Sequence, residues 1–107
     1  MELVKILIAA IHDPAAIGAL KAIKDAGRSL KNTVVVGHDA TLSARKELVK
    51  TNSCLLGSIG FFPEKYGEQI IPMVLKILGG EAVPPMAYIE HKLITKENVE
   101  LLYPHKH

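Results

Sequence analysis

Two His-Asp dipeptides, His12-Asp13 and His38-Asp39, carry the side chains of this sequence that are best suited to chemistry. Each follows a run of aliphatic residues, and a third apolar run ends in the aromatic pair Phe61-Phe62. Carboxylates and imidazoles form hydrogen bonds with polar ligands or bind divalent metals, and aromatic rings stack on sugar rings. These residues are the candidates for a functional site.

Structural roles compete with functional ones at the same positions. Asp13 precedes a proline and can serve as the N-cap of a helix, so it needs no ligand to explain it. Asp39 precedes Thr41, which already offers a cap, so a turn residue and a ligand contact are equally good interpretations of Asp39. Phe61 and Phe62, taken alone, are more typical of a core.

A metal site built from the two His-Asp pairs is an alternative hypothesis, because two imidazoles and two carboxylates are sufficient ligands for a divalent ion. The sequence has no His-x-x-x-His or Glu-x-x-His spacing to support it, and His91, His105 and His107 are scattered. Glycine-rich phosphate loops and a Gly-x-Ser-x-Gly elbow are also missing. We therefore expect no catalytic residue, no cofactor and no metal.

Alternating strands and helices must position these residues. Apolar runs predict strands at 4–10, 33–37, 53–59 and 86–94. Helices are expected to begin at Asp13, Thr41, Pro63 and Thr95. The first helix should end at Gly27 and the third at Gly79-Gly80. Pro72 lies within the third helix and should kink or divide it. This order predicts an α/β fold of three layers, with a mostly parallel sheet of about four strands and the candidate residues beyond the strand ends.

Helical spacing also predicts which side chains face the core. The first helix is expected to carry Ile17, Leu20 and Ile23 inward. The residues at helical spacing in the second are Leu42, Arg45, Leu48 and Val49, and those that form a stripe on the third are Tyr66, Ile70, Met73, Val74 and Ile77.

Composition limits the class of protein. The chain has 107 residues, 49% of them hydrophobic and 22% charged, which suits one globular α/β domain over residues 1–107. A net charge of +2 gives no sign of a nucleic-acid surface. The single cysteine, Cys54, lies in an apolar run and is expected to be buried. No run is long enough for a membrane span and no signal peptide is recognisable, so the chain as encoded is expected in the cytoplasm.

Five stretches together resemble the C-terminal portion of the type I periplasmic sugar-binding proteins, and the related ligand domains of LacI-type repressors. In chain order they are HDPAAIGALKAIKDAGR, TVVVGHDA, LLGSIGFFPEKYG, ILGGEAVPP and LITKENVELLYP. The resemblance covers nearly the whole chain and implies a flavodoxin-like half of the two-lobed binding-protein fold. The ending Lys-Glu-Asn-Val and Tyr-Pro is typical of the transporter-associated members rather than the repressors.

The resemblance implies a set of carbohydrate contacts. Asp13 and Asp39 match aspartates of the family, His12 stands where ribose-type members have an asparagine, and Phe61 stands at a hinge glutamine. With Phe62 beside it, Phe61 can stack on a ligand ring. The expected function is a non-enzymatic carbohydrate-binding domain, with His12, Asp13, Asp39, Phe61 and Phe62 as ligand-binding residues.

The resemblance also bears on partners and location. It covers the C-terminal lobe and the segments that cross the hinge, so we expect a truncated relative with weak or no ligand binding alone. The third helix would normally pack in the other lobe, so the missing N-terminal lobe or a second copy of the chain is the expected protein partner. Parent proteins act with an ABC permease and are periplasmic or lipid-anchored outside the cell. A LacI-type repressor fragment and a small metal-dependent enzyme or metal sensor remain alternatives.

Overall fold

The computed structural model describes residues 5–104, which form two compact units. Unit 1 runs to Gly60 and resumes at Lys92, and unit 2 is Phe61–His91. Residue 4, the start of the first predicted strand, and His105 and His107 lie outside the described residues. Each unit is described by itself.

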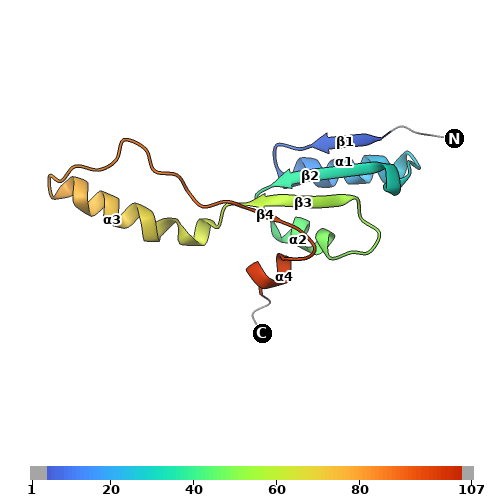
Figure 1. Cartoon of the computed structure of the whole chain (residues 1–107). Coiled ribbons are helices and arrows are strands. Elements are labelled where there is room, and N and C mark those ends of the chain that lie inside the picture. The colour runs from blue at the N-terminus through green and yellow to red at the C-terminus, as the bar shows by residue number, and fades with distance from the viewer. Residues whose placement is uncertain (1–4, 105–107) are drawn as a thin grey trace. The chain divides into compact units, whose positions relative to one another are not determined.

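A four-stranded sheet forms the centre of unit 1. Its strands lie in the order β1-β2-β3-β4, the first three parallel and the last antiparallel to its neighbour. This arrangement confirms the expected α/β fold and mostly parallel sheet (Figure 1). The strands are β1 (Ile6–Ala9), β2 (Thr33–His38), β3 (Leu55–Gly60) and β4 (Lys92–Ile94).

The fourth strand is much shorter than predicted. Only Lys92–Ile94 pairs with β3, so the prediction of a strand from residue 86 is wrong for 86–91. That segment belongs to unit 2, which contains helices and no strand. Apolar side chains alone do not make a strand, because its backbone groups also need a paired neighbour.

Three α-helices complete unit 1: α1 (Asp13–Asp25), α2 (Leu42–Leu48) and α4 (Val99–Leu102). Thr41 caps α2 as predicted, its Oγ1 accepting from the Ala44 N–H at 3.3 Å. The left-handed Gly27, with φ of 65°, follows α1 as predicted. Two boundaries differ: the N-cap of α1 is His12 rather than Asp13, and the last helix starts after Asn98 rather than at Thr95.

Helices α1 and α2 contact each other and cover one face of the sheet, so unit 1 has two layers where three were expected. The opposite face leaves Leu7, Leu56 and Leu93 exposed by 74%, 58% and 49%. The strands are neighbours in chain order, and successive right-handed crossovers in one direction leave their helices on the same side. The core lies between sheet and helices and includes Ala16, Ile23, Val35, Ala44, Leu48, Leu55, Ile94 and Val99.

Only part of the set at helical spacing in the second helix is buried. Helix α2 buries Ala44 and Leu48, whereas Leu42 and Val49 are exposed. The helix has only seven residues, so it presents little more than one narrow stripe to the sheet. Cys54 is buried as predicted, and this burial raises the pKa of its thiol.

Unit 2 contains the short 3-10 helix η2 (Pro63–Lys65) and α3 (Tyr66–Leu78). Pro72 lies inside α3 without dividing it. None of the residues of α3 is buried, and its exposed large side chains are 46% to 78% accessible. They are Ile70, Ile71, Val74, Leu75, Ile77 and Leu78.

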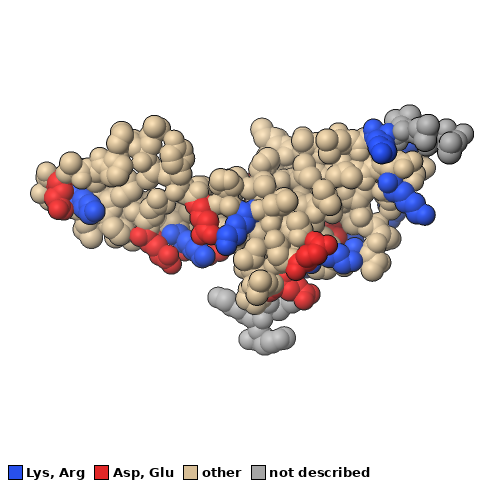
Figure 2. All heavy atoms as spheres, in the orientation of Figure 1, with Lys and Arg blue, Asp and Glu red and all other residues tan. Residues whose placement is uncertain are grey.

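Helix α3 carries one acidic residue, Glu68 in its first turn, and one basic residue, Lys76 in its last turn. Figure 2 shows acidic side chains beside basic ones in this part of the chain.

Across residues 5–104, no helix combines the length and the apolar character required to traverse a bilayer.

Gly37 in β2 provides a test of the packing between sheet and helix. A Cβ atom here would run into Asp13 Oδ1 and lie 3.2 Å from the Ala16 Cβ. We expect Gly37→Ala to lower the free energy of unfolding by about 1–3 kcal/mol, as overpacking of a core does. The measurement is urea denaturation followed by circular dichroism.

Gly18→Ala is the matched control, because Gly18 lies within α1 and a Cβ atom there meets nothing within 4 Å. Alanine favours helix, so this variant should gain about 0.5–1 kcal/mol. Equal effects of the two substitutions would contradict the described contact between β2 and α1.

Candidate functional site

The carboxylate of Asp13 joins three elements at the carboxyl ends of the parallel strands. Asp13 is fully buried as the first residue of α1. Its Oδ1 accepts from the Ser58 hydroxyl of β3 at 2.6 Å, and its Oδ2 accepts from the Thr41 N–H before α2 at 2.7 Å. Both oxygens are therefore used inside the protein, and Asp13 positions the neighbouring segments.

Ser58 continues this network to the loop that follows β2. Its Oγ accepts from the Ala40 N–H at 3.0 Å while its hydroxyl donates to Asp13. Ser58 is fully buried and was missed by the sequence analysis. A signal existed, because a serine inside an otherwise apolar strand needs a hydrogen-bond partner.

Asp39 differs from Asp13 in every respect that matters for binding. Its side chain is exposed, and within residues 5–104 its carboxylate has no hydrogen-bond or ion-pair partner. Its backbone φ is 99°, and that of Ala40 is 48°. Non-glycine residues rarely adopt such values, which cost about 1–3 kcal/mol each and occur often at functional sites.

Hydrogen bonds hold this strained turn in place. The Asp39 N–H donates to the Ile59 carbonyl oxygen at 2.7 Å, so the turn is tied to β3 at two consecutive residues, Asp39 and Ala40. The Asp39 carboxylate is therefore presented on fixed backbone at the strand ends.

The two histidines have different hydrogen bonds. His12 Nδ1 accepts from the Ala15 N–H at 3.1 Å, so in the neutral ring Nε2 carries the proton. The His12 side chain is exposed, which leaves this N–H available as a donor. His38 Nδ1 lies 3.1 Å from the Ala10 carbonyl oxygen and donates to it, linking the ends of β2 and β1.

The aromatic pair belongs to unit 2. Phe62 is buried, has a φ of 51°, and lies with its ring centroid 5.2 Å from Lys65 Nζ. Phe61 is half-buried, and its ring centroid lies 6.3 Å from that of His91. Both phenylalanines line a pocket of about 290 Å³, together with Lys65, Tyr66, Glu68, Gln69, Ile89 and Glu90.

The structure thus gathers His12, Asp13 and Asp39 at one edge of unit 1, and Phe61 and Phe62 around a pocket in unit 2. At the edge, the Asp39 carboxylate offers two acceptor oxygens and His12 offers one donor, a combination that suits hydroxyl groups. The metal hypothesis gains no support, because residues 5–104 contain no group of three or more His, Cys, Asp or Glu placed to hold an ion. Both Asp13 oxygens are also already engaged.

Sequence comparison finds relatives among binding proteins. The chain is 36% identical over 95 residues to a Rhizobium meliloti protein provisionally named a rhizopine-binding protein. It is 31% identical over 86 residues to the ribose import binding protein of Escherichia coli K12. These alignments cover 86% and 80% of this chain, but only 29% and 28% of the two relatives. No protein-family model matches the chain.

Comparison with solved structures gives the same result. An ABC transporter periplasmic solute-binding protein from Actinobacillus succinogenes 130z, with bound D-allose, has a TM-score of 0.74 and 25% identity over 89% of this chain. A solute-binding protein from Agrobacterium vitis, with bound allitol, has a TM-score of 0.77 over 90% of this chain. The second is 24% identical and shows the fold alone.

This chain covers 33% and 32% of those two structures, so it spans about a third or less of the length of the proteins it matches. The relatives are binding proteins rather than enzymes, and they confirm the resemblance carried by the five sequence stretches. Over most of its length the chain is homologous to a segment of the periplasmic sugar-binding proteins of ABC transporters.

Proposed function

We propose that the chain forms part of a carbohydrate-binding site and catalyses no reaction, with Asp39 as the principal ligand contact. The observation that carries this proposal is the exposed, unpartnered Asp39 carboxylate, held on strained backbone at the ends of parallel strands. In open parallel sheets, ligands bind beyond these ends. His12 supplies the donor, and Asp13 acts indirectly by fixing the segments around it.

A pentose, hexose or polyol fits this chemistry. A carboxylate accepts from two neighbouring hydroxyl groups, and such charge-assisted bonds are about twice as strong as neutral ones. The His12 N–H can donate to a third ligand oxygen. A relative named for ribose import and a solved neighbour with bound D-allose support this ligand class.

Affinity of the 107-residue chain by itself should be low. His12 and Asp39 are both exposed, whereas tight small-molecule sites enclose most of the ligand surface. Within unit 2, the half-buried Phe61 lines that unit's own pocket and is the proposed stacking residue there, whereas the buried Phe62 offers a ligand little surface. In its cellular role the chain would act with an ABC transporter, the class printed for the solved neighbour that holds D-allose.

Carbohydrate binding can be measured by titrating the ¹⁵N-labelled chain with ribose, D-allose, allitol and myo-inositol and recording amide shifts. We expect at least one ligand to shift the amides around 12–13 and 38–41, with a Kd of about a millimolar or weaker. Asp39→Asn should weaken this binding about tenfold, since it removes the charge from the accepting group.

Asp25→Asn is the matched control, because Asp25 is an exposed carboxylate near the end of α1 that pairs with Lys21. It should bind as the parent chain does. The proposal fails if no carbohydrate shifts these amides at high millimolar concentration, or if Asp25→Asn and Asp39→Asn weaken binding equally.

Backbone strain at Asp39 predicts a conflict between stability and binding. Glycine adopts a φ of 99° without penalty, so Asp39→Gly should raise the free energy of unfolding by about 1 kcal/mol while abolishing binding. A loss of stability in Asp39→Gly would contradict the assigned strain.

Ser58→Ala should lower the free energy of unfolding by about 1–3 kcal/mol, because the buried Asp13 carboxylate loses a donor.

We also propose that the chain associates with a second copy of itself through α3. Six large apolar side chains of this helix are exposed on two adjacent stripes, and extended apolar surface of this kind favours association. Ile71 and Leu75 lie four residues apart on the same stripe.

Light scattering after size-exclusion chromatography measures this association. We expect a mass above 11.6 kDa that rises with concentration, and the double variant Ile71→Glu with Leu75→Glu should return it to the monomer value. Lys76→Glu, an exposed polar position of the same helix, is the control for a change of charge. A monomeric parent chain at all concentrations would overturn the proposal.

A further inference from the structure

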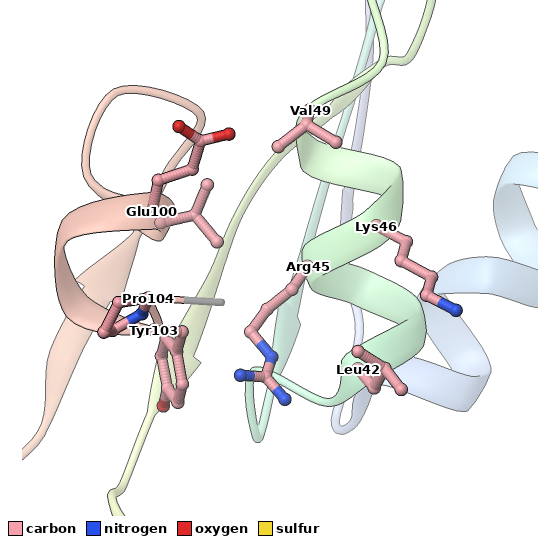
Figure 3. A pocket seen from close by; sticks show the side chains of 8 residues that line it. Leu42, Arg45, Lys46, Val49, Glu100, Tyr103 and Pro104 are labelled. Carbon is pink, nitrogen blue, oxygen red and sulfur yellow. The ribbon is translucent and has the colours of Figure 1, made fainter. Parts of the chain in front are cut away.

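A second pocket lies within unit 1, between α2 and α4, and none of the proposed carbohydrate contacts lines it. Its volume is about 220 Å³. Its apolar lining is formed by Leu42, Val49, Val99 and Pro104, and the side chains of Arg45 and Tyr103 lie next to each other in the same pocket (Figure 3). An apolar cavity of about 150 Å³ can admit benzene, so the space suffices for a small ring compound.

The guanidinium group of Arg45 is stacked on Tyr103, and its buried nitrogen is unpaired. Its guanidinium carbon lies 4.2 Å from the centroid of the Tyr103 ring, which fixes the plane of the group by stacking. Its Nε is buried and has no hydrogen-bond partner. Within residues 5–104 the guanidinium makes no hydrogen bond or ion pair, so its terminal N–H groups, which are not fully buried, are available to an acceptor in the pocket.

The charges around Arg45 favour an anionic acceptor. Lys46 and Glu100 also line the pocket, so the three ionised groups sum to one positive charge. Within residues 5–104, no ion pair joins Arg45 to Glu100, although both face the same pocket. Figure 3 shows Lys46 extending away from Arg45 and Tyr103, which leaves the guanidinium as the group that would contact an anion.

We propose that this pocket binds a small organic carboxylate with an aromatic or branched apolar body. The carboxylate would accept two parallel bonds from the two terminal nitrogens of Arg45, a bidentate arrangement that guanidinium groups favour. The body would lie against Leu42, Val49 and Val99. Inorganic phosphate meets the same guanidinium but gains nothing from these apolar walls.

Benzoate is a suitable probe, and benzamide is its uncharged counterpart of the same shape. We expect titration of the ¹⁵N-labelled 107-residue chain with benzoate to shift amides of α2 and α4 saturably. Benzamide and inorganic phosphate should each bind at least tenfold more weakly. Amides at 12–13 and 38–41 should not move, which separates this site from the carbohydrate site.

Single substitutions test whether benzoate contacts Arg45. Arg45→Lys keeps the charge but loses the bidentate fork and should weaken benzoate binding at least tenfold, whereas Lys31→Gln, which removes an exposed cation elsewhere in unit 1, should leave it unchanged. Glu100→Gln should tighten binding a few-fold by removing a negative charge from an exposed position. This variant provides a test even if substitution of Arg45 disturbs the fold.

Several results would overturn the proposal. They are equal binding of benzoate and benzamide, phosphate binding as strong as benzoate binding, unchanged affinity in Arg45→Lys, or weaker affinity in Glu100→Gln.

Discussion

The buried carboxylate of Asp13 is the constraint on which the strand-end region depends. It accepts from Ser58 in β3 and from the Thr41 N–H before α2, so a single side chain ties together the starts of two helices and a central strand. Helix α1 begins at this residue, and the positive end of the helix dipole favours a negative charge there. Gly37 must lack a side chain because the Asp13 carboxylate occupies that space. Through Ser58 the same network fixes Ala40, and with it the strained turn that presents Asp39.

Two His-Asp dipeptides with the same composition therefore have opposite roles. In the first, the aspartate is inside and the histidine is exposed as the helix cap. In the second, the histidine bonds to the Ala10 carbonyl oxygen and the aspartate is exposed. A carboxylate with two internal donors has little capacity left for a ligand, whereas an exposed carboxylate on rigid backbone keeps its full capacity. The difference in burial between Asp13 and Asp39, rather than their residue type, determines which carboxylate is available to a ligand.

Much of this architecture could be predicted, and the failures have identifiable causes. The β-branched run around Val35 and the Thr41 cap depend on local sequence, and both were located correctly. The cap of α1 was assigned to Asp13 because helix statistics do not show that the Ser58 hydroxyl, 45 residues away, captures its carboxylate. Strand 86–94 was overextended because pairing with β3 is a long-range property. The open sheet face was missed because alternation of elements does not fix the order of strands.

The open face of the sheet in unit 1 and helix α3 in unit 2 both expose apolar surface. Leu7, Leu56 and Leu93 on the sheet remain exposed, as do the apolar stripes of α3, and burial of such surface is favourable by about 25 cal/mol per Å². The relatives are about three times longer than this chain, so they have additional polypeptide with which to cover equivalent surfaces. Within unit 1, the exposed leucines lie on the face of the sheet, whereas His12 and Asp39 lie beyond its strand ends. Covering the sheet face can therefore stabilise unit 1 without occupying the proposed ligand contacts, so the stability of the sheet and access to these two side chains depend on different surfaces.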